Sequence, residues 1–209
     1  NKNYFVVRMG NSSANKINFT NKNFFDYAHS SINSDVMDLY LTSKCKFFVA
    51  TQSGILDTAH MFNKPILMTN MNEIFCSYPL KKNDRGIFKT IKIKGQNTSL
   101  NLLDYIKMDY SKHNPMKEVS GFDFEENSPE ELYESILEFE NIYKDKNYNL
   151  SENQLKINKI VKNRFNNSLY KELINVSDPF YKFENSKMAF FVKSTKGSLC
   201  NHYLRKIFQ

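Results

Sequence analysis

The first seventy residues alternate between short apolar runs and segments with helical periodicity. The apolar runs predict strands at residues 4–8, 24–28, 46–50 and 66–69. Helical spacing of apolar residues predicts one helix from Ser34 to Leu41 and a second that ends at Phe62. Strands that alternate with helices in this way are typical of a parallel α/β sheet. Because the run at 46–50 has no polar alternation, we expect that strand to be covered on both faces.

The pattern becomes less regular after residue 70. It predicts a polar loop at 81–86, a strand at 87–93, a short helix at 99–108 and a strand at 122–124. A clear helix start follows at Ser128-Pro129-Glu130-Glu131. Serine is a good cap, proline fits the first turn, and a glutamate three positions after the cap can close a capping box.

The carboxyl-terminal part of the chain is predicted to be mainly helical. Residues 151–154 repeat the capping pattern and open a helix that we expect to continue to Ile174. An extended stretch at 188–192 and a basic helix from Gly197 follow. We therefore divide the chain into an α/β domain at 1–146 and a helical carboxyl-terminal extension at 147–209 that packs on it.

Composition indicates a folded, globular chain. It has 209 residues, of which 41% are hydrophobic, and a chain of this length can bury roughly 70% of its unfolded surface. Few glycines and prolines and many aromatic residues exclude collagen-like, disordered and disulfide-stapled classes. Cys45, Cys76 and Cys200 are widely spaced and cannot pair completely, which indicates a reducing compartment. Since no stretch approaches the ~20 apolar residues of a membrane span, we expect a cytoplasmic protein.

The net charge of +7 is typical of proteins that bind nucleic acid or an anionic membrane. Its makeup argues against nucleic acid, because nearly all of the positive charge is lysine. The arginines are Arg8, Arg85, Arg164 and Arg205. Recognition of bases and phosphates favours arginine for its planar fork of donors. We interpret the lysine excess as mostly solvated surface and expect no nucleic-acid partner.

The loop after the strand at 46–50 is the first candidate for ligand binding. In an open parallel sheet, ligands bind where the carboxyl ends of strands lead into helices, and Thr51-Gln52-Ser53-Gly54 occupies such a position. Gly54 allows close approach of the backbone, amides at a helix start favour phosphate, and Thr51 and Ser53 add hydroxyl donors. The simpler interpretation is that Ser53 caps the helix and Gly54 relieves a tight turn.

Arg8 is the second candidate, because it ends the first predicted strand and should lie at the same edge of the sheet. Its fork of donors could pair with a diphosphate, or it could form a surface salt bridge. Asp26 and His29 fall at the end of the next apolar run and are candidate catalytic residues, although a lone histidine is often structural. Asn70 closes the strand at 66–69, either as a sugar contact or as a turn former.

Other chemistries find little support in the sequence. The histidines are far apart, and we find no cysteine or acidic partner at metal-ligand spacing, so no metal is expected. The glycine signatures of dinucleotide cofactors and P-loops are absent, as is the Gly-x-Ser-x-Gly of α/β-hydrolases. The glutamates at 125–131 are better explained by helix capping and the helix dipole than by catalysis.

The residues that carry these candidates also resemble a family of bacterial glycosyltransferases associated with surface polysaccharide synthesis. The resemblance is dense over residues 4–70, patchy to 140 and faint beyond. Its strings are Phe5-Val6-Val7-Arg8-Met9-Gly10, Asp26-Tyr27-Ala28-His29-Ser30, Ser34-Asp35-Val36-Met37-Asp38, Cys45 through Gly54, Phe62-Asn63-Lys64-Pro65, Asn127 through Glu131, and Tyr203-Leu204-Arg205-Lys206. The loop at 11–23 departs from the family by being rich in Asn and Lys and poor in proline, so an acceptor contact there is not carried over.

The resemblance implies the carboxyl-terminal half of a GT-B-like enzyme, in which a Rossmann-like parallel sheet flanked by helices holds a nucleotide-sugar donor. It implies that Arg8 faces the diphosphate, that Ser53 and Gly54 cradle phosphate, and that Asp26 and His29 line the cleft. The acceptor would be a glycan or lipid-linked, with peripheral contact to the inner membrane face. Such enzymes commonly need no metal, and the chain lacks an Asp-x-Asp motif. Because the first residue is Asn rather than Met and residues 1–3 lead straight into an apolar run at Tyr4, we expect a piece of a longer protein that lacks its acceptor domain.

Two rival interpretations stay open. A nucleotide-sugar epimerase or hydrolase could use the same fold, since fold does not determine function. A non-catalytic binder of anionic polymers could use the lysine-rich surface, and its affinity would fall steeply with salt.

Overall fold

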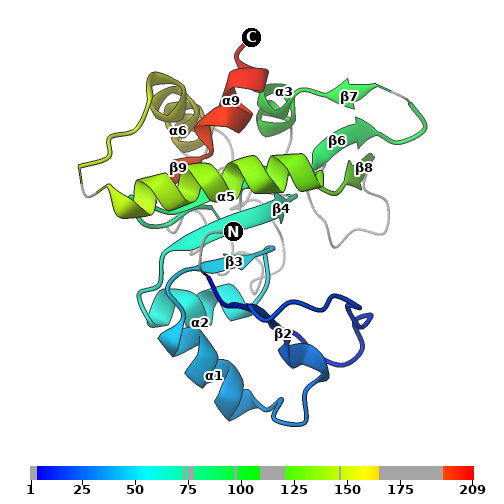
Figure 1. The fold of residues 1–209 in the computed structure, drawn as a ribbon. Helices are drawn as coiled ribbons and strands as arrows, with labels where there is room; N and C mark the ends of the chain where they lie inside the picture. The colour runs from blue at the N-terminus through cyan, green and yellow to red at the C-terminus, as the bar shows by residue number, and fades with distance from the viewer. Residues whose placement is uncertain are drawn as a thin grey trace, which may run out of the picture.

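The computed structural model describes residues 4–72, 74, 78–96, 98–108, 121–145, 147–164 and 195–209, without the side chain of Arg164. Its largest sheet is parallel and has the strand order β3-β4-β5-β9 (Figure 1). The strands are β3 (Phe48–Ala50), β4 (Ile66–Met71), β5 (Arg85–Phe88) and β9 (Ser198–Leu199). The predicted parallel sheet of an α/β chain is therefore confirmed within these residues.

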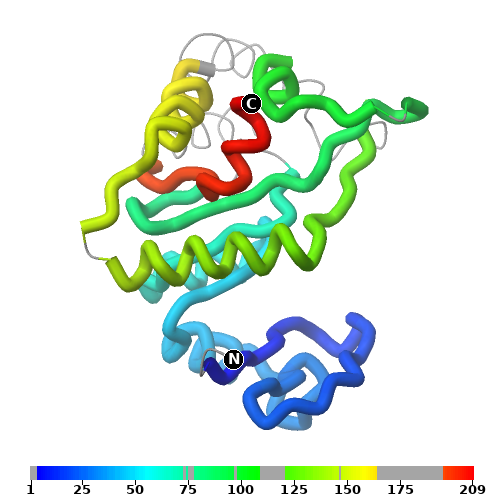
Figure 2. Tube along the Cα trace, turned by 45° about the horizontal axis from the view of Figure 1, so that its top comes forward, coloured from blue at the N-terminus to red at the C-terminus, as the bar shows by residue number. Residues whose placement is uncertain are grey.

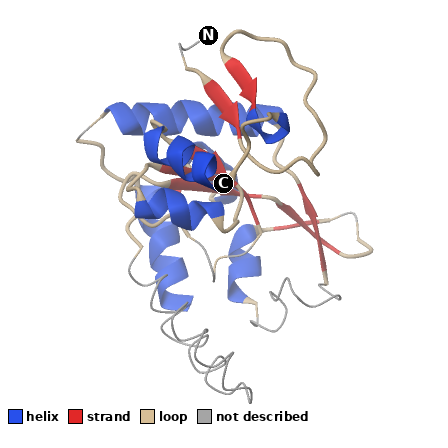
Figure 3. Cartoon of the chain, turned by 90° about the horizontal axis from the view of Figure 1, so that it is seen from below, coloured by secondary structure: helices blue, strands red, loops and turns tan. Residues whose placement is uncertain are grey.

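Two smaller sheets accompany the large one. One consists of β1 (Val6–Arg8) and β2 (Phe24–Asp26), which pair in parallel, and the other is antiparallel, with β6 (Thr90–Ile93) between β7 (Ser99–Leu100) and β8 (Phe122–Glu125). Figure 3 shows β1 and β2 side by side near the amino terminus. In Figure 2 this blue segment lies at one end of the molecule, and the residues coloured green to red lie at the other end.

Helices cover both faces of the large sheet. They are α1 (Asp35–Lys44), α2 (Ile55–Met61), α3 (Leu102–Lys107), α5 (Pro129–Lys144), α6 (Glu152–Arg164) and α9 (Asn201–Ile207), with a 3-10 turn, η1, at Tyr27–His29. On one face, Phe139 of α5 packs against Leu67 of β4 and Ile87 of β5. Residues of α2, α3 and α6 join the larger core on the other face.

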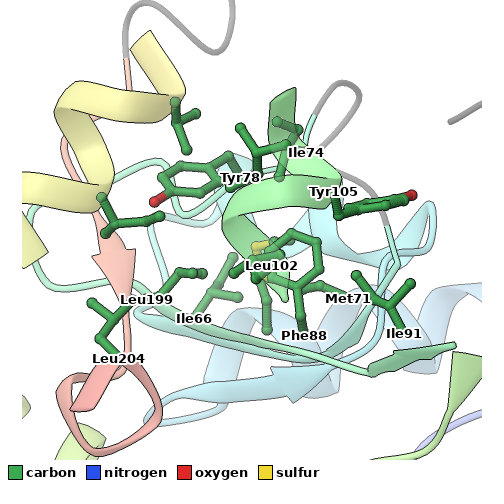
Figure 4. Packing of buried hydrophobic residues seen from close by; sticks show 14 of the residues in the cluster. Ile66, Met71, Ile74, Tyr78, Phe88, Ile91, Leu102, Tyr105, Leu199 and Leu204 are labelled. Atoms are coloured by element: carbon green, nitrogen blue, oxygen red, sulfur yellow. The ribbon is translucent and has the colours of Figure 1, made fainter. Parts of the chain in front are cut away.

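The larger core contains residues from both ends of the described chain. Along β4, Ile66 and Met68 belong to this core, whereas Leu67 between them points to the α5 face, as the two-residue period of a strand requires. Figure 4 shows Phe88, Leu102 and Leu199 meeting in this core. The carboxyl-terminal residues are thus part of the central fold.

The predicted carboxyl-terminal extension supplies a strand as well as helices. Ser198 and Leu199 of β9 pair with Arg85 and Gly86 of β5. The segment before β9 runs so close to residues 79–81 that a Cβ on Gly197 would lie 2.6 Å from the Pro79 carbonyl oxygen. The sequence predicted a helix from residue 197, but α9 begins only at Asn201, because residues 198–199 complete the sheet. The division of the chain at residue 146 stays a prediction.

Local sequence signals explain where the helices begin. The Ser128 hydroxyl accepts from the Glu131 amide at 3.2 Å, and the Glu131 carboxylate accepts from the Ser128 amide at 3.1 Å, so the predicted capping box is confirmed. Ser34 caps α1 by accepting from the Met37 amide at 3.3 Å, also as predicted. Asn101 caps α3 through the Leu103 amide at 2.8 Å.

Other predictions are wrong in detail. Val49 is 41% exposed, because β3 lies at an edge of its sheet and is not covered on both faces. The predicted strand at 87–93 is two strands in different sheets, β5 and β6, and the polar loop ends earlier, at Asp84. The predicted helix at 99–108 begins with β7, which pairs with β6.

Several predictions fall on residues that the structure does not describe. These are the continuation of α6 to Ile174, the extended stretch at 188–192, and the surroundings of Cys76 and His113. Within the described ranges, none of the helices combines the length and the apolar character that crossing a membrane requires.

Candidate functional site

Arg8 and Asp26 lie opposite each other at the carboxyl ends of β1 and β2. They are register partners in the parallel pair. Nη1 of Arg8 donates to both carboxylate oxygens of Asp26, at 2.9 and 3.1 Å. Both side chains are partly exposed, Arg8 at 22% and Asp26 at 12%. Among the described residues, the other N–H groups of the Arg8 guanidinium have no hydrogen-bond partner, so they can donate to an anion.

The surroundings of Asp26 keep its carboxyl group ionised. Partial burial alone would raise the pKa of Asp26, but a hydrogen bond from the Ile17 amide at 3.2 Å and the neighbouring Arg8 guanidinium outweigh it. The pKa of Asp26 therefore lies below its ordinary value. A carboxylate in this state fixes the orientation of Arg8 at neutral pH.

The loop between β1 and β2 folds back onto the same strand ends. Nε2 of His29, in the turn η1 after β2, lies 2.7 Å from the Ala14 carbonyl oxygen. Nδ2 of Asn33 donates to the Gly10 carbonyl at 2.9 Å. Gly10 adopts φ +133°, a conformation that side-chain-bearing residues rarely take. Arg8 and Asp26 are thus paired directly, whereas His29 contacts the loop at Ala14 and lies near enough to Asp26 to influence its pKa by charge; we call these three residues the Arg8 cluster.

The second predicted group, Thr51, Ser53 and Gly54, lies in the loop from β3 to α2. Ser53 Oγ donates to the Thr51 carbonyl at 3.3 Å, and all three residues are exposed. Ser53 does not cap α2, because Gly54 is the capping residue and no side chain caps this helix. Gly54 has helical φ and ψ, and a Cβ there would meet open space. Neither a tight turn nor a close backbone contact within the described residues therefore requires glycine.

Asn70 has a clear structural role. It adopts φ 52°, in the left-handed region that asparagine tolerates, where the β4–β5 register shifts. Its amide donates to Oδ1 of Asn127 at 2.7 Å, and the Asn127 amide donates to Oδ1 of Asn70 at 2.6 Å. Nδ2 of Asn127 also donates to the Phe88 carbonyl at 2.6 Å. Asn70 therefore does not close the strand or form a turn, as the sequence predicted, because β4 continues to Met71 and Asn70 lies within it at the register shift; a sugar contact stays a prediction.

The structure does not place the Arg8 cluster and the 51–54 loop at the same edge of one sheet, as the sequence predicted. Between the Arg8 cluster and the 51–54 loop, no hydrogen bond or ion pair joins the residues that the structure describes, and β1 and β2 form their own sheet. The chain segments just before β1 and β3 do lie near each other. The ring of Tyr4, before β1, makes an edge contact with the ring of Phe47, before β3, with 5.2 Å between the ring centroids. Gln52, which the sequence analysis did not weigh, accepts from the Asn72 amide at 2.9 Å and ties the ends of β3 and β4 together.

A second cluster of chemically active residues lies on the α5 side of the large sheet. Donor atoms of Glu138, Cys200 and His202 are all within 4.8 Å of one another. Cys200 and His202 are two positions apart, so the expectation that no cysteine lies at metal-ligand spacing from a histidine is wrong for this pair. Their Cys-x-His spacing was a usable signal, whereas nothing in the sequence linked Glu138 to them.

Comparisons with known proteins leave the family of the chain undetermined. No protein-family model matches it, and no curated protein or solved structure shows significant similarity.

Proposed function

We propose that the chain is part of a glycosyltransferase that moves a sugar from a nucleotide-sugar donor to a glycan or lipid-linked acceptor. The sequence resemblance to bacterial glycosyltransferases of surface polysaccharide synthesis supports this proposal, together with a parallel sheet flanked by helices. The finer assignment to a Rossmann-like GT-B domain belongs to the same proposal. The single observation that carries it is Arg8, which Asp26 holds at the carboxyl end of β1 with further N–H donors available.

In the proposed reaction, the acceptor displaces a nucleoside diphosphate at the anomeric carbon of the sugar. Negative charge develops on the departing diphosphate, and a preoriented guanidinium stabilises that charge without reorganising. The Asp26 carboxylate occupies Nη1, so Arg8 would present its remaining donors to phosphate oxygens. Hydroxyls of Thr51 and Ser53 would add donors if the diphosphate spans the two loops.

The role of His29 follows from its position. Nε2 is directed at the Ala14 carbonyl in the loop that folds over the strand ends. We propose that His29 lines the donor site and keeps this loop in place, and that the base for the acceptor comes from elsewhere in the enzyme. The expected location is the cytoplasm, with peripheral contact to the inner membrane face where a lipid-linked acceptor would be presented.

A binding panel tests this proposal and its rivals. Nucleotide sugars and nucleoside diphosphates are screened against the protein by thermal shift, and the hits are repeated with Arg8→Ala and with Arg205→Ala as an exposed control on α9. The proposal predicts a stabilising nucleotide whose effect is lost only in Arg8→Ala. Release of free sugar without acceptor would favour an epimerase or hydrolase. Affinity for polyanions that falls steeply with salt and ignores Arg8 would favour a polymer binder.

A further inference from the structure

Glu138, Cys200 and His202 are brought together by two elements that are remote in sequence. Glu138 lies on α5, Cys200 follows β9, and His202 is in the first turn of α9. Helices α5 and α9 lie side by side on the sheet (Figures 1 and 2). This packing leaves a thiol, an imidazole nitrogen and a carboxylate oxygen within 4.8 Å of one another.

Backbone and side-chain contacts fix the orientation of two of these groups. The Glu138 carboxylate accepts from the amides of Asn201 at 2.6 Å and His202 at 3.0 Å. Oε2 of Glu138 lies 3.0 Å from Nδ1 of His202, and Nε2 of the same ring lies 3.3 Å from Ser135 Oγ. A histidine that binds metal through one nitrogen normally has its other nitrogen hydrogen-bonded to an oxygen. Ser135 is placed to do this if Nδ1 is the ligand.

Burial suits a small ion better than an organic ligand. The side chains of Glu138 and His202 are 17% and 18% exposed, whereas Cys200 is fully buried. An ion can therefore approach from the side of the carboxylate and the ring. Because sulfur binds metal as the thiolate, coordination by Cys200 would release the thiol proton.

We propose that Glu138, Cys200 and His202 form a zinc site, with Glu138 Oε, Cys200 Sγ and His202 Nδ1 as the protein ligands. Thiolate, imidazole and carboxylate are the donor types that Zn²⁺ takes in proteins, and three of them leave a fourth position for water. Zinc bonds of about 2.0–2.3 Å place tetrahedral ligand atoms roughly 3.3–3.8 Å apart. The Glu138 oxygen and His202 Nδ1, 3.0 Å apart, would therefore separate slightly, and the Cys200 sulfur, within 4.8 Å of both, would move inwards by at most about 1 Å.

The competing interpretation is purely structural. Glu138 caps the amino-terminal end of α9 through two backbone amides, and His202 adds an ion pair, which needs no metal. Under this interpretation the cysteine is only a buried apolar side chain. The two interpretations differ in whether the protein takes up a thiophilic cation at this position.

Titration of the whole chain with Co²⁺ and then Zn²⁺ separates them. The proposal predicts one Co²⁺ per chain with a thiolate charge-transfer band, displacement of Co²⁺ by Zn²⁺, and a higher Tm with Zn²⁺. Cys200→Ser should abolish the thiolate band and His202→Gln should weaken Zn²⁺ binding at least tenfold, while Cys45→Ser, at the other described cysteine, changes neither. Absence of the band in the unsubstituted protein overturns the proposal without any variant, and so does unchanged Zn²⁺ affinity in folded Cys200→Ser and His202→Gln.

Discussion

The reciprocal pair of Asn70 and Asn127 allows a sharp test of how the chain connects β4 to α5. Replacing Asn127 by alanine removes two of the three hydrogen bonds of the pair. It leaves the Asn70 amide and the Phe88 carbonyl without their partners, whereas the bond from the Asn127 amide to Oδ1 of Asn70 can persist. Phe88 is 1% exposed and Asn127 7% exposed, so water reaches these groups poorly.

The expected loss of stability follows from these two orphaned groups. A buried donor or acceptor left unpaired costs about 1–3 kcal/mol, so Asn127→Ala, which leaves two, should lower the free energy of unfolding by about 2–6 kcal/mol. In a chain of about 200 residues, each kcal/mol lowers Tm by roughly 2–4 °C. The predicted fall in Tm is therefore about 4–24 °C.

Urea denaturation followed by circular dichroism measures the change directly. Asn127→Asp serves as a graded variant, because it keeps an acceptor for the Asn70 amide but turns an oxygen towards the Phe88 carbonyl. Asn141→Ala, at an exposed position on α5, controls for the loss of an asparagine and should leave stability within about 0.5 kcal/mol. If Asn127→Ala unfolds at the same urea concentration as Asn141→Ala, the pair does not hold these elements together.

Three further predictions concern stability. Gly197→Ala should destabilise the fold by more than about 2 kcal/mol, because the new Cβ would lie 2.6 Å from Pro79 backbone, and an unchanged urea midpoint would refute the close approach. Ser128→Ala should cost about 1 kcal/mol by removing one half of the capping box, measured in the same way. The folded-state pKa of Asp26 is lowered, so its contribution to stability is present above the ordinary carboxyl pKa and is lost as pH falls through the lower folded value. Asp26→Asn should therefore flatten the acid limb of the stability curve, and an identical acid limb would show that its pairing with Arg8 is not maintained in solution.

Local signals in the sequence were sufficient for several elements. The capping box at Ser128 and the apolar run of β4 each involve only neighbouring residues, and both were predicted correctly. Two-residue strands such as β9 have no periodicity to detect. Their existence depends on partners far away in the chain, since Ser198 pairs with Arg85. Such pairings are visible only in space.

The same difference between local signals and long-range contacts applies to the candidate site. Arg8, Asp26 and His29 each lie at the end of an apolar run, and the structure pairs Arg8 with Asp26 while His29 contacts the loop between their strands. The sequence did not show that Asp26 pairs with Arg8, because the register of β1 against β2 brings together residues 18 positions apart in the chain. Asn70 was chosen by position alone, and its engagement with Asn127, 57 residues later, could not be foreseen.

The central claim is that the Arg8 cluster binds the diphosphate of a nucleotide-sugar donor. Calorimetric titration of the protein with a panel of nucleoside diphosphates tests it most directly, with Arg8→Ala, Ser53→Ala and the exposed control Arg205→Ala measured at one ionic strength. We predict that one diphosphate binds and that its Kd rises at least tenfold in Arg8→Ala, about 1.4 kcal/mol, and also rises in Ser53→Ala, while Arg205→Ala binds unchanged. Failure of every nucleoside diphosphate to bind, or equal affinity in all four proteins, would contradict the claim.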